Sequence, residues 1–202
     1  IKPRSGSIPE LDCIDVHGEI IPLNGIVGGD HLIYMDFKKR YDLDARIKQA
    51  SEEGRSEVVK NLKRCQHMAG IAVIDVSGHQ TTDSMLSAMV HQAFLMGALY
   101  ELDNFGEITS KLFENLNTRL YRSSLVSKFV TVLYGEITAN ATFRFLSAAH
   151  PKPLVFSAEN DKFTEIRPEL FTSFPPLGTI PSEQDIDRTR TKSVLGFKSR
   201  YE

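Results

Sequence analysis

The sequence lacks both a long apolar run and an excess of charge of either sign. No hydrophobic stretch approaches the roughly 18–20 residues that a membrane span requires. The 24 Lys and Arg residues nearly balance the 26 Asp and Glu residues, which gives a net charge of −2. Proteins that bind nucleic acid usually carry a basic excess or a basic stripe. The composition therefore predicts no membrane span in this segment and no nucleic-acid partner.

Cysteine is scarce, and a start signal is missing. Cys13 and Cys65 are too few for a disulfide framework, and their spacing is not that of a metal site. We expect both to be reduced thiols in a cytoplasmic protein, because thiols stay reduced in the cytosol. The first residues include neither an initiator methionine nor the apolar core of a signal peptide. We therefore expect the sequence to be a piece of a longer protein.

What remains is typical of a globular domain. Hydrophobic residues make up 41% and charged residues 25% of the 202 residues, which is ordinary for a protein with a core of its own. Residues 1–10 contain two prolines, a glycine and two serines, and this composition predicts a linker. We expect residues 11–202 to form one domain.

Hydrophobic patterning predicts both strands and helices. The expected strands are residues 11–20, 71–76, 129–137, 142–149, 153–157 and 162–166, and we expect residues 26–37 to form a turn that leads into a further strand. Residues 139–141 form a turn between two of these strands, which predicts a hairpin. Residues 42–68 are charged with helical spacing, and Gly54 makes them one imperfect helix or two short ones. Their charged side chains favour a solvated helix face, with partner binding or dimerisation as the alternative.

Two further helices complete the predicted α+β layout of antiparallel strands with helices packed outside. One begins near Thr82 and carries the apolar residues Met85, Met89, Phe94, Met96 and Leu99. We expect its methionines to fill gaps in the core and not to line a binding groove. The other spans residues 107–121, and its apolar stripe consists of Ile108, Leu112, Leu116 and Leu120.

Two carboxylates stand out by their position. Asp30 follows two glycines, and Asp75 ends an apolar strand. Glycine lets the backbone approach a ligand closely, and carboxylates at a strand end can bind a hard cation such as Mg²⁺ or Mn²⁺. Gly-Asp is also a common turn pair. Each carboxylate is therefore only a weak signal when it is taken alone.

The two carboxylates and three later segments together resemble a known family. It is the metal-dependent Ser/Thr protein phosphatases (PPM family), in the bacterial branch that includes the SpoIIE-like and stress-response regulator phosphatases. The segments keep the family's order, and the resemblance covers roughly Pro9 to Tyr201. They are residues 27–30 (Val-Gly-Gly-Asp), 74–79 (Ile-Asp-Val-Ser-Gly-His), 129–137 (beginning Phe-Val-Thr), 145–154 (ending His-Pro-Lys-Pro-Leu) and 176–178 (Pro-Leu-Gly).

The resemblance implies a fold and a site. The fold would be an αββα sandwich, in which two stacked, mainly antiparallel β-sheets are flanked by helices. Asp30 would be one metal ligand, Asp75 would bridge two Mn²⁺ or Mg²⁺ ions, and the backbone carbonyl of Val76 would coordinate one of them. A water held between the ions would attack the phosphorus of phosphoserine or phosphothreonine in line.

The resemblance also implies a biological setting. The domain would be the output module of a bacterial signalling protein, and its substrate would be a phosphoprotein such as an anti-sigma-factor antagonist. We expect a sensor domain upstream, with a homodimer as one option for its assembly. The helices between Thr82 and Tyr121 would respond to regulation.

The sequence departs from the family in several places. The later Thr-Asp-Gly motif, whose aspartate is a metal ligand, is absent, and so is a further aspartate near the family's end. We therefore expect the C-terminal strands to be missing and this piece to be weak or inactive as an enzyme. Ala149 stands where the family usually has glycine. Residues 42–68 are longer than the usual connection, which predicts an inserted helical element.

Two other functions are alternatives to a phosphatase. A catalytically impaired, phosphatase-like regulatory binding module fits the absent motif. A nucleotide cyclase also uses Gly-Gly-Asp, but His31 and Leu32 follow Asp30 here in place of that hairpin's acidic-aromatic pair. We regard four polar residues as secondary site candidates for which a structural role is the first interpretation: Asp36, His79, Asp83 and His150.

Overall fold

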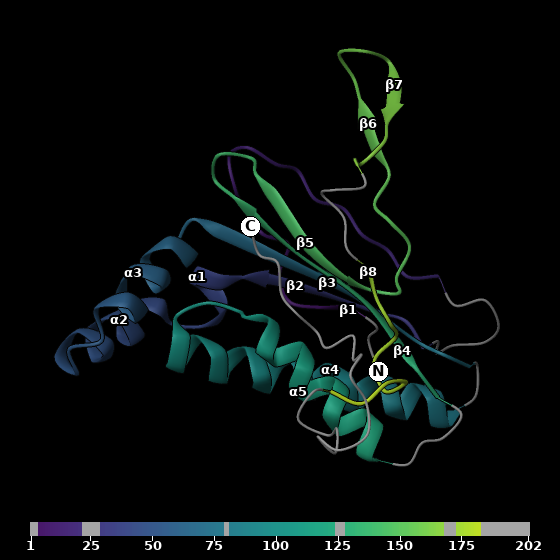
Figure 1. The fold of residues 1–202 in the computed structure, drawn as a ribbon. Helices are drawn as coiled ribbons and strands as arrows, with labels where there is room; N and C mark the ends of the chain where they lie inside the picture. The colour runs from purple at the N-terminus through teal and green to yellow at the C-terminus, as the bar shows by residue number, and fades with distance from the viewer. Residues whose placement is uncertain (1–3, 22–28, 79–80, 124–127, 168–172, 183–202) are drawn as a thin grey trace.

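The fold is built on a six-stranded sheet. The computed structural model describes residues 4–21, 29–78, 81–123, 128–167 and 173–182. The strand order is β1-β2-β3-β4-β5-β8, and two further strands, β6 and β7, form a separate small sheet (Figure 1). The strands of the large sheet are β1 (Arg4–Ser5), β2 (His31–Asp36), β3 (Met68–Val76), β4 (Val130–Thr138), β5 (Phe143–Ala148) and β8 (Ser173–Phe174). Strands β2 to β5 pair antiparallel, whereas β1 and β8 add in parallel at the two edges.

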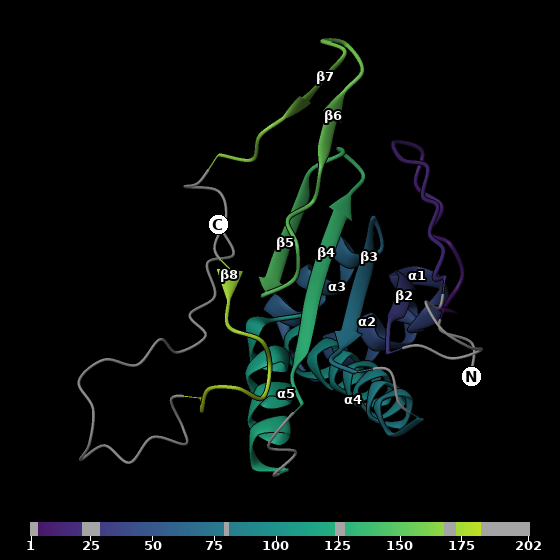
Figure 2. The same ribbon diagram turned by 90° about the vertical axis from the view of Figure 1, so that its right-hand side faces the viewer.

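Helices cover one face of the large sheet. Figures 1 and 2 show α4 (Thr81–Phe105) and α5 (Ser110–Arg122) on this face. The hairpin of β6 (Val155–Ser157) and β7 (Lys162–Thr164) projects on the other side. Three shorter helices follow β2, namely α1 (Phe37–Arg40), α2 (Leu43–Glu52) and α3 (Ser56–Cys65). The predicted α+β class, with mainly antiparallel sheets flanked by helices, is confirmed.

Aromatic side chains form the centre of the core between the sheet and the two long helices. Phe94 of α4, Phe113 of α5 and Tyr134 of β4 are each 1% exposed or less. Their ring centroids lie 5.4 to 6.2 Å apart, a separation at which aromatic rings attract one another beyond the effect of burial alone. These three rings hold α4 and α5 on the sheet.

Several predicted elements are confirmed. Strands β4 and β5 pair as the expected hairpin, and its turn places Ala141 at a φ of 61°. Strands β6 and β7, which lie within the predicted strands 153–157 and 162–166, pair antiparallel across the turn at residues 158–161. The apolar stripe predicted for helix α5 faces the core, and its residues Leu112 and Leu116 are buried. Residues 42–68 form two helices and not one, because Gly54 between them adopts a φ of 71°, which interrupts a right-handed helix.

The strand predicted over residues 11–20 is wrong. These residues contain only an isolated bridge between Leu11 and Ile14, whose N–H donates to the Leu11 carbonyl at 3.2 Å. The segment crosses the side chains of β2 and does not pair with a strand. A side chain at Gly18 would overlap Leu32 and Tyr34. The glycine and the aspartates of this segment favour turns, and they outweigh its loose alternation of apolar residues.

The predicted core face of α4 is wrong for its three methionines, although Phe94 of the same predicted set is buried. Met85, Met89 and Met96 are 62%, 67% and 68% exposed. The buried stripe lies on the opposite side of the helix and consists of Leu86, Val90, Phe94, Ala98 and Leu102. Because α4 is apolar on both sides, helical spacing alone fits either stripe. The helix continues to Phe105, beyond the last of the predicted apolar residues, Leu99.

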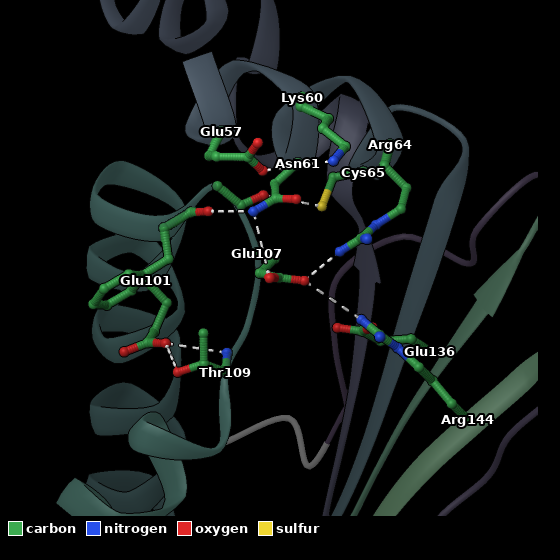
Figure 3. A network of polar contacts seen from close by, with 12 residues as sticks. Glu57, Lys60, Asn61, Arg64, Cys65, Glu101, Glu107, Thr109, Glu136 and Arg144 are labelled. Atoms are coloured by element: carbon green, nitrogen blue, oxygen red, sulfur yellow. Dashed lines mark hydrogen bonds and ion pairs between the residues drawn. The ribbon is translucent and has the colours of Figure 1, made fainter. Parts of the chain in front are cut away.

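A polar network ties α3 to the connection after α4 and to the large sheet (Figure 3). Glu107, in the connection between α4 and α5, pairs with Arg64 of α3 and with Arg144 of β5. Arg144 also pairs with the buried Glu136 at 2.6 Å, and the Tyr134 hydroxyl donates to Glu136 at 2.7 Å. A buried carboxylate needs such partners. The network therefore joins α3, the end of α4 and the middle of the sheet.

The two thiols differ in environment, and this difference predicts their reactivity. Cys65 is buried and donates to the Gly106 carbonyl at 3.3 Å. Burial raises its pKa to about 12. Cys13 is exposed. Because the thiolate is the reactive form, we expect a thiol reagent such as DTNB at pH 8 to label one cysteine of the folded protein and both after denaturation.

The matched control for this labelling is Cys13→Ser, which should abolish the fast reaction in the folded protein. Rapid labelling of two thiols in the native protein would contradict the burial of Cys65.

In the helices of the described ranges, no segment combines the length and the apolar character that crossing a bilayer requires.

Candidate active site

The two predicted acidic ligands lie at the same edge of the sheet. Asp30 directly precedes β2, and Asp75 is the next-to-last residue of β3. The strands pair antiparallel, with His31 opposite Ile74. Continued by one position, the same register places Asp30 opposite Asp75. Asp30 is exposed and Asp75 is half-buried, so two carboxylates that are distant in the sequence lie at the same solvent-facing end of one strand pair.

Gly29 brings the third predicted ligand to this edge. A Cβ atom at Gly29 would lie only 2.5 Å from the Val76 carbonyl oxygen, so a side chain there would displace the strand end. The Gly29 carbonyl accepts a hydrogen bond of 2.6 Å from the buried hydroxyl of Ser87 on α4. The glycine before Asp30 thus allows the close approach that the sequence pattern indicated.

A second contact holds α4 against the start of β2. The Nδ1 atoms of His31 and His91 lie 2.7 Å apart, and both rings are buried. Burial lowers the pKa of His91 to about 4, and the neighbouring His31 acts in the same direction. At neutral pH the two rings are therefore uncharged and share one hydrogen bond. The helix that borders the site is fixed to the strand that carries Asp30.

The donors at this edge are all oxygens. Carboxylates and a backbone carbonyl are the ligands that Mg²⁺ and Mn²⁺ prefer, and Mg²⁺ usually keeps several waters beside one or two carboxylates. The residues Asp30, Asp75 and Val76 therefore fit a hard divalent cation by donor type and by the close approach at Gly29. Within the described ranges, no three His, Cys, Asp or Glu side chains converge on one point.

The turn after β3 is fixed to the segment before β4. Ser77 donates its N–H to the Phe129 carbonyl at 3.0 Å, and its hydroxyl accepts from the Phe129 N–H at 3.0 Å. Gly78 follows with a φ of 113°, a conformation that only glycine adopts readily. A side chain at Gly78 would overlap the Asp83 carboxylate and lie 2.7 Å from the Lys128 ammonium.

An ion pair lies beside this turn. The Lys128 ammonium is 2.8 Å from Oδ1 of Asp83. The Asp83 side chain is 2% exposed and that of Lys128 is 28% exposed. Asp83 lies in the first turn of α4, where a negative charge also interacts favourably with the helix dipole. The carboxylate is thus paired with a lysine and buried beneath the turn.

A hydroxyl and an imidazole flank Asp75 on the other side. Thr131 of β4 lies opposite Asp75 in the β3–β4 register, and its Oγ1 is 2.9 Å from Nδ1 of His150. Burial lowers the pKa of His150, and the Asp75 carboxylate opposes this shift. Ala149, which stands where the resemblance has glycine, adopts a φ of 53° in the left-handed region that favours glycine.

The other secondary candidates have different positions. Asp36 lies at the opposite end of β2 from Asp30 and caps α1 by accepting from the Lys39 N–H at 3.0 Å. Asp36 therefore caps a helix, and it does not lie at the sheet edge that contains Asp75. His79 lies outside the described residues.

Sequence patterns did not single out Lys128 or Thr131. A lone lysine before a strand resembles any solvated charge, and a threonine within a strand is an ordinary β-former. The only available signal was the neighbourhood of Thr131 in the Phe-Val-Thr segment. The contacts of both residues with distant segments become visible only in the fold.

Comparison with known families shows to which protein family the chain belongs. The family model of Stage II sporulation protein E (SpoIIE) matches residues 66–193, more than half of the chain. The chain belongs to the SpoIIE family. The predicted resemblance to SpoIIE-like phosphatases is confirmed. The part that matches the SpoIIE model includes Asp75, Val76, Lys128 and His150, whereas Asp30 precedes it.

The chain is also similar to a solved structure. No curated protein matches it significantly. The crystal structure of the RsbU and RsbW domains of Rv1364c from Mycobacterium tuberculosis is 23% identical, with a TM-score of 0.43. The match covers 56% of this chain and 29% of that one. The chain therefore spans less than a third of the structure to which it is similar.

Proposed function

We propose that this SpoIIE-family chain is a Mn²⁺- or Mg²⁺-dependent protein phosphatase domain that acts on phosphoserine or phosphothreonine. The observation that carries the proposal is the juxtaposition at the end of β2 and β3. There Asp30, Asp75 and the Val76 carbonyl lie at one sheet edge, and Gly29 allows the backbones to approach each other. Family membership supports the class of reaction.

The proposed residues have separate tasks. Asp30, Asp75 and the Val76 carbonyl would hold a pair of divalent cations. When bound, these cations would supply a hydroxide nucleophile at neutral pH and offset the charge of the phosphate. The Ser77 clamp onto Phe129 fixes the turn that carries Val76. The site would thus be built on paired strands, which hold side chains more firmly than a free loop does.

The imidazole beside Asp75 fits the same reaction. Because burial lowers the pKa of His150, the ring is neutral at pH 7 and adds no positive charge that would compete for the Asp75 carboxylate. Its bond to Thr131 fixes the orientation of the ring. His150 can therefore donate or accept a hydrogen bond at the edge of the site without changing its charge.

The proposed partner is a phosphorylated protein of a bacterial signalling system, such as an anti-sigma-factor antagonist. A protein substrate fits an open sheet edge better than an enclosed pocket would, because Asp30 is exposed and Asp75 is half-buried. The proposal places the domain in the cytoplasm, where free thiols such as Cys13 and Cys65 stay reduced.

The metal requirement provides the test. We expect the full-length natural protein to release phosphate from a phosphoserine protein in the presence of Mn²⁺. The chelator EDTA should reduce the rate to background, and added Mn²⁺ should restore it, because EDTA removes the cations that would supply the hydroxide nucleophile. Phosphate release is measured at fixed protein concentration with the cation omitted, chelated and restored.

Two outcomes would contradict the proposal. Turnover that is unaffected by EDTA would show that the reaction does not depend on a metal. Binding of the phosphoprotein without any turnover at saturating Mn²⁺ would favour the alternative function, a catalytically impaired phosphatase-like binding module.

A further inference from the structure

The geometry beside Gly78 points to Lys128 as the residue that holds the phosphate group of the substrate. Asp83 is then the positioning residue that aims the Lys128 ammonium at this group. The inference rests on the proposed function, because it assigns a phosphate-binding role at the same sheet edge. It concerns the chain's own side chains and not the cations that the site would hold.

The location of the ammonium is the first step. Its nitrogen lies 2.7 Å from the position of a Cβ at Gly78, which is separated from Asp75 by only Val76 and Ser77. The Gly78 carbonyl in turn lies 3.5 Å from the position of a Cβ at Gly29, the neighbour of Asp30. The lysine is therefore beside the turn that follows Asp75 and lies close to the neighbour of Asp30, although it comes from the segment before β4.

The fixed position of the ammonium is the second step. Asp83 is almost fully buried and lies 2.8 Å from the ammonium. The segment that carries the lysine is clamped through both backbone groups of its neighbour, Phe129. A lysine side chain normally samples many rotamers, and holding one in place has an entropic cost. The buried carboxylate and the clamped backbone provide that constraint before any substrate arrives.

The third step concerns the hydrogen-bond donors of the Lys128 ammonium that the pair with Asp83 does not use. An ammonium carries three donor hydrogens, and the pair with Asp83 engages one of them. The Lys128 side chain remains 28% exposed, so part of this side chain is in contact with solvent. A phosphoserine carries a charge of about −1.5 to −2 at pH 7 and three acceptor oxygens. A pre-positioned cation suits such a group because it needs no reorganisation when charge shifts.

Gly78 allows the ion pair to lie directly beside the turn. Its φ of 113° and the overlap that any side chain would make with Asp83 require glycine at this position. The Asp83 carboxylate and the Lys128 ammonium can therefore pack against the backbone of the turn that follows Asp75 and Val76.

The competing interpretation is that Lys128 only neutralises the buried charge of Asp83. Lys128→Met alone does not decide between the two roles, because it leaves Asp83 buried and unpaired and destabilises the protein. The decisive variant is the double substitution Lys128→Met with Asp83→Asn, which removes both charges at once. A counter-ion is no longer needed in that variant, whereas a phosphate ligand is still lost.

The test measures binding and turnover on the full-length protein. Calorimetric titration with inorganic phosphate in the presence of Mg²⁺ gives the dissociation constant directly, and steady-state assays on a phosphoserine peptide give kcat and KM. We expect the double variant to weaken phosphate binding and raise KM by about tenfold or more, since hydrogen bonds to charged groups are strong. Lys128→Arg should recover part of this loss, and Lys162→Met, which changes an exposed lysine on β7, should change neither value.

The outcomes separate this inference from the proposed function. Phosphate binding and KM equal to those of the wild type in the folded double variant overturn the role of Lys128, and so does a wild-type protein that binds no phosphate. A wild-type protein without turnover that still binds phosphate through Lys128 supports this inference and overturns the phosphatase activity.

Discussion

Asp75→Asn is expected to lower Mn²⁺-dependent phosphate release by at least about a hundredfold. Replacing residues that only support a metal ligand already costs about 10–100-fold in metal affinity or activity, and Asp75 is proposed as a ligand itself. The amide has nearly the shape of the carboxylate but carries no charge, and it is a poorer partner for a hard cation. Asp75 also lies centrally, opposite both Asp30 and Thr131.

The matched control is Asp161→Asn, the same chemical change in the exposed turn between β6 and β7. Asp161 adopts a φ of 49°, which asparagine tolerates well. The control should keep wild-type kcat/KM and wild-type affinity for Mn²⁺ measured by calorimetry. If Asp75→Asn retained activity within a few-fold of the wild type, Asp75 would not be a ligand that the reaction needs.

Phe113→Ala is expected to lower the free energy of unfolding by about 3–5 kcal/mol, the usual cost of truncating a buried phenylalanine. The ring is fully buried between Phe94 and Tyr134. Its loss would leave a cavity between α4, α5 and β4 and remove two aromatic contacts. Urea denaturation followed by circular dichroism measures the change in stability.

The control for this prediction is Met96→Ala on the exposed side of α4. Met96 is 68% exposed, so its truncation should change the free energy of unfolding by no more than about 0.5 kcal/mol, as is usual for surface positions. A large loss for Met96→Ala together with a small loss for Phe113→Ala would mean that α4 presents its other side to the sheet.

The residues proposed for the site stand out in the sequence, although each carboxylate alone is a weak signal and only the order of the family-like segments singles them out. Asp30 follows glycines and Asp75 ends a buried strand, and each feature is visible within a few residues. The strands themselves were predictable where apolar runs are bounded by turn residues, as in the β4–β5 hairpin. Such signals are local, and local preference agrees with the final fold at these places.

The remainder depended on contacts between distant segments. The side of α4 that faces the sheet is decided by packing against Phe113 and Tyr134, because both sides of the helix are apolar. Residues 11–20 alternate loosely, but no strand edge is available to them where they cross β2. Lys128 becomes a candidate site residue only through its ion pair with Asp83, which lies far from it in the sequence.

The helices between β2 and β3 leave the two proposed acidic ligands at the other end of this strand pair. The connection through α1, α2 and α3 joins the strands at Asp36 and Ala69. At the opposite end the two strands continue into separate segments, and the contacts of Gly29 with Ser87 and of His31 with His91 hold that end to α4. The position of the two acidic side chains therefore depends on α4 and not on the connection between their own strands.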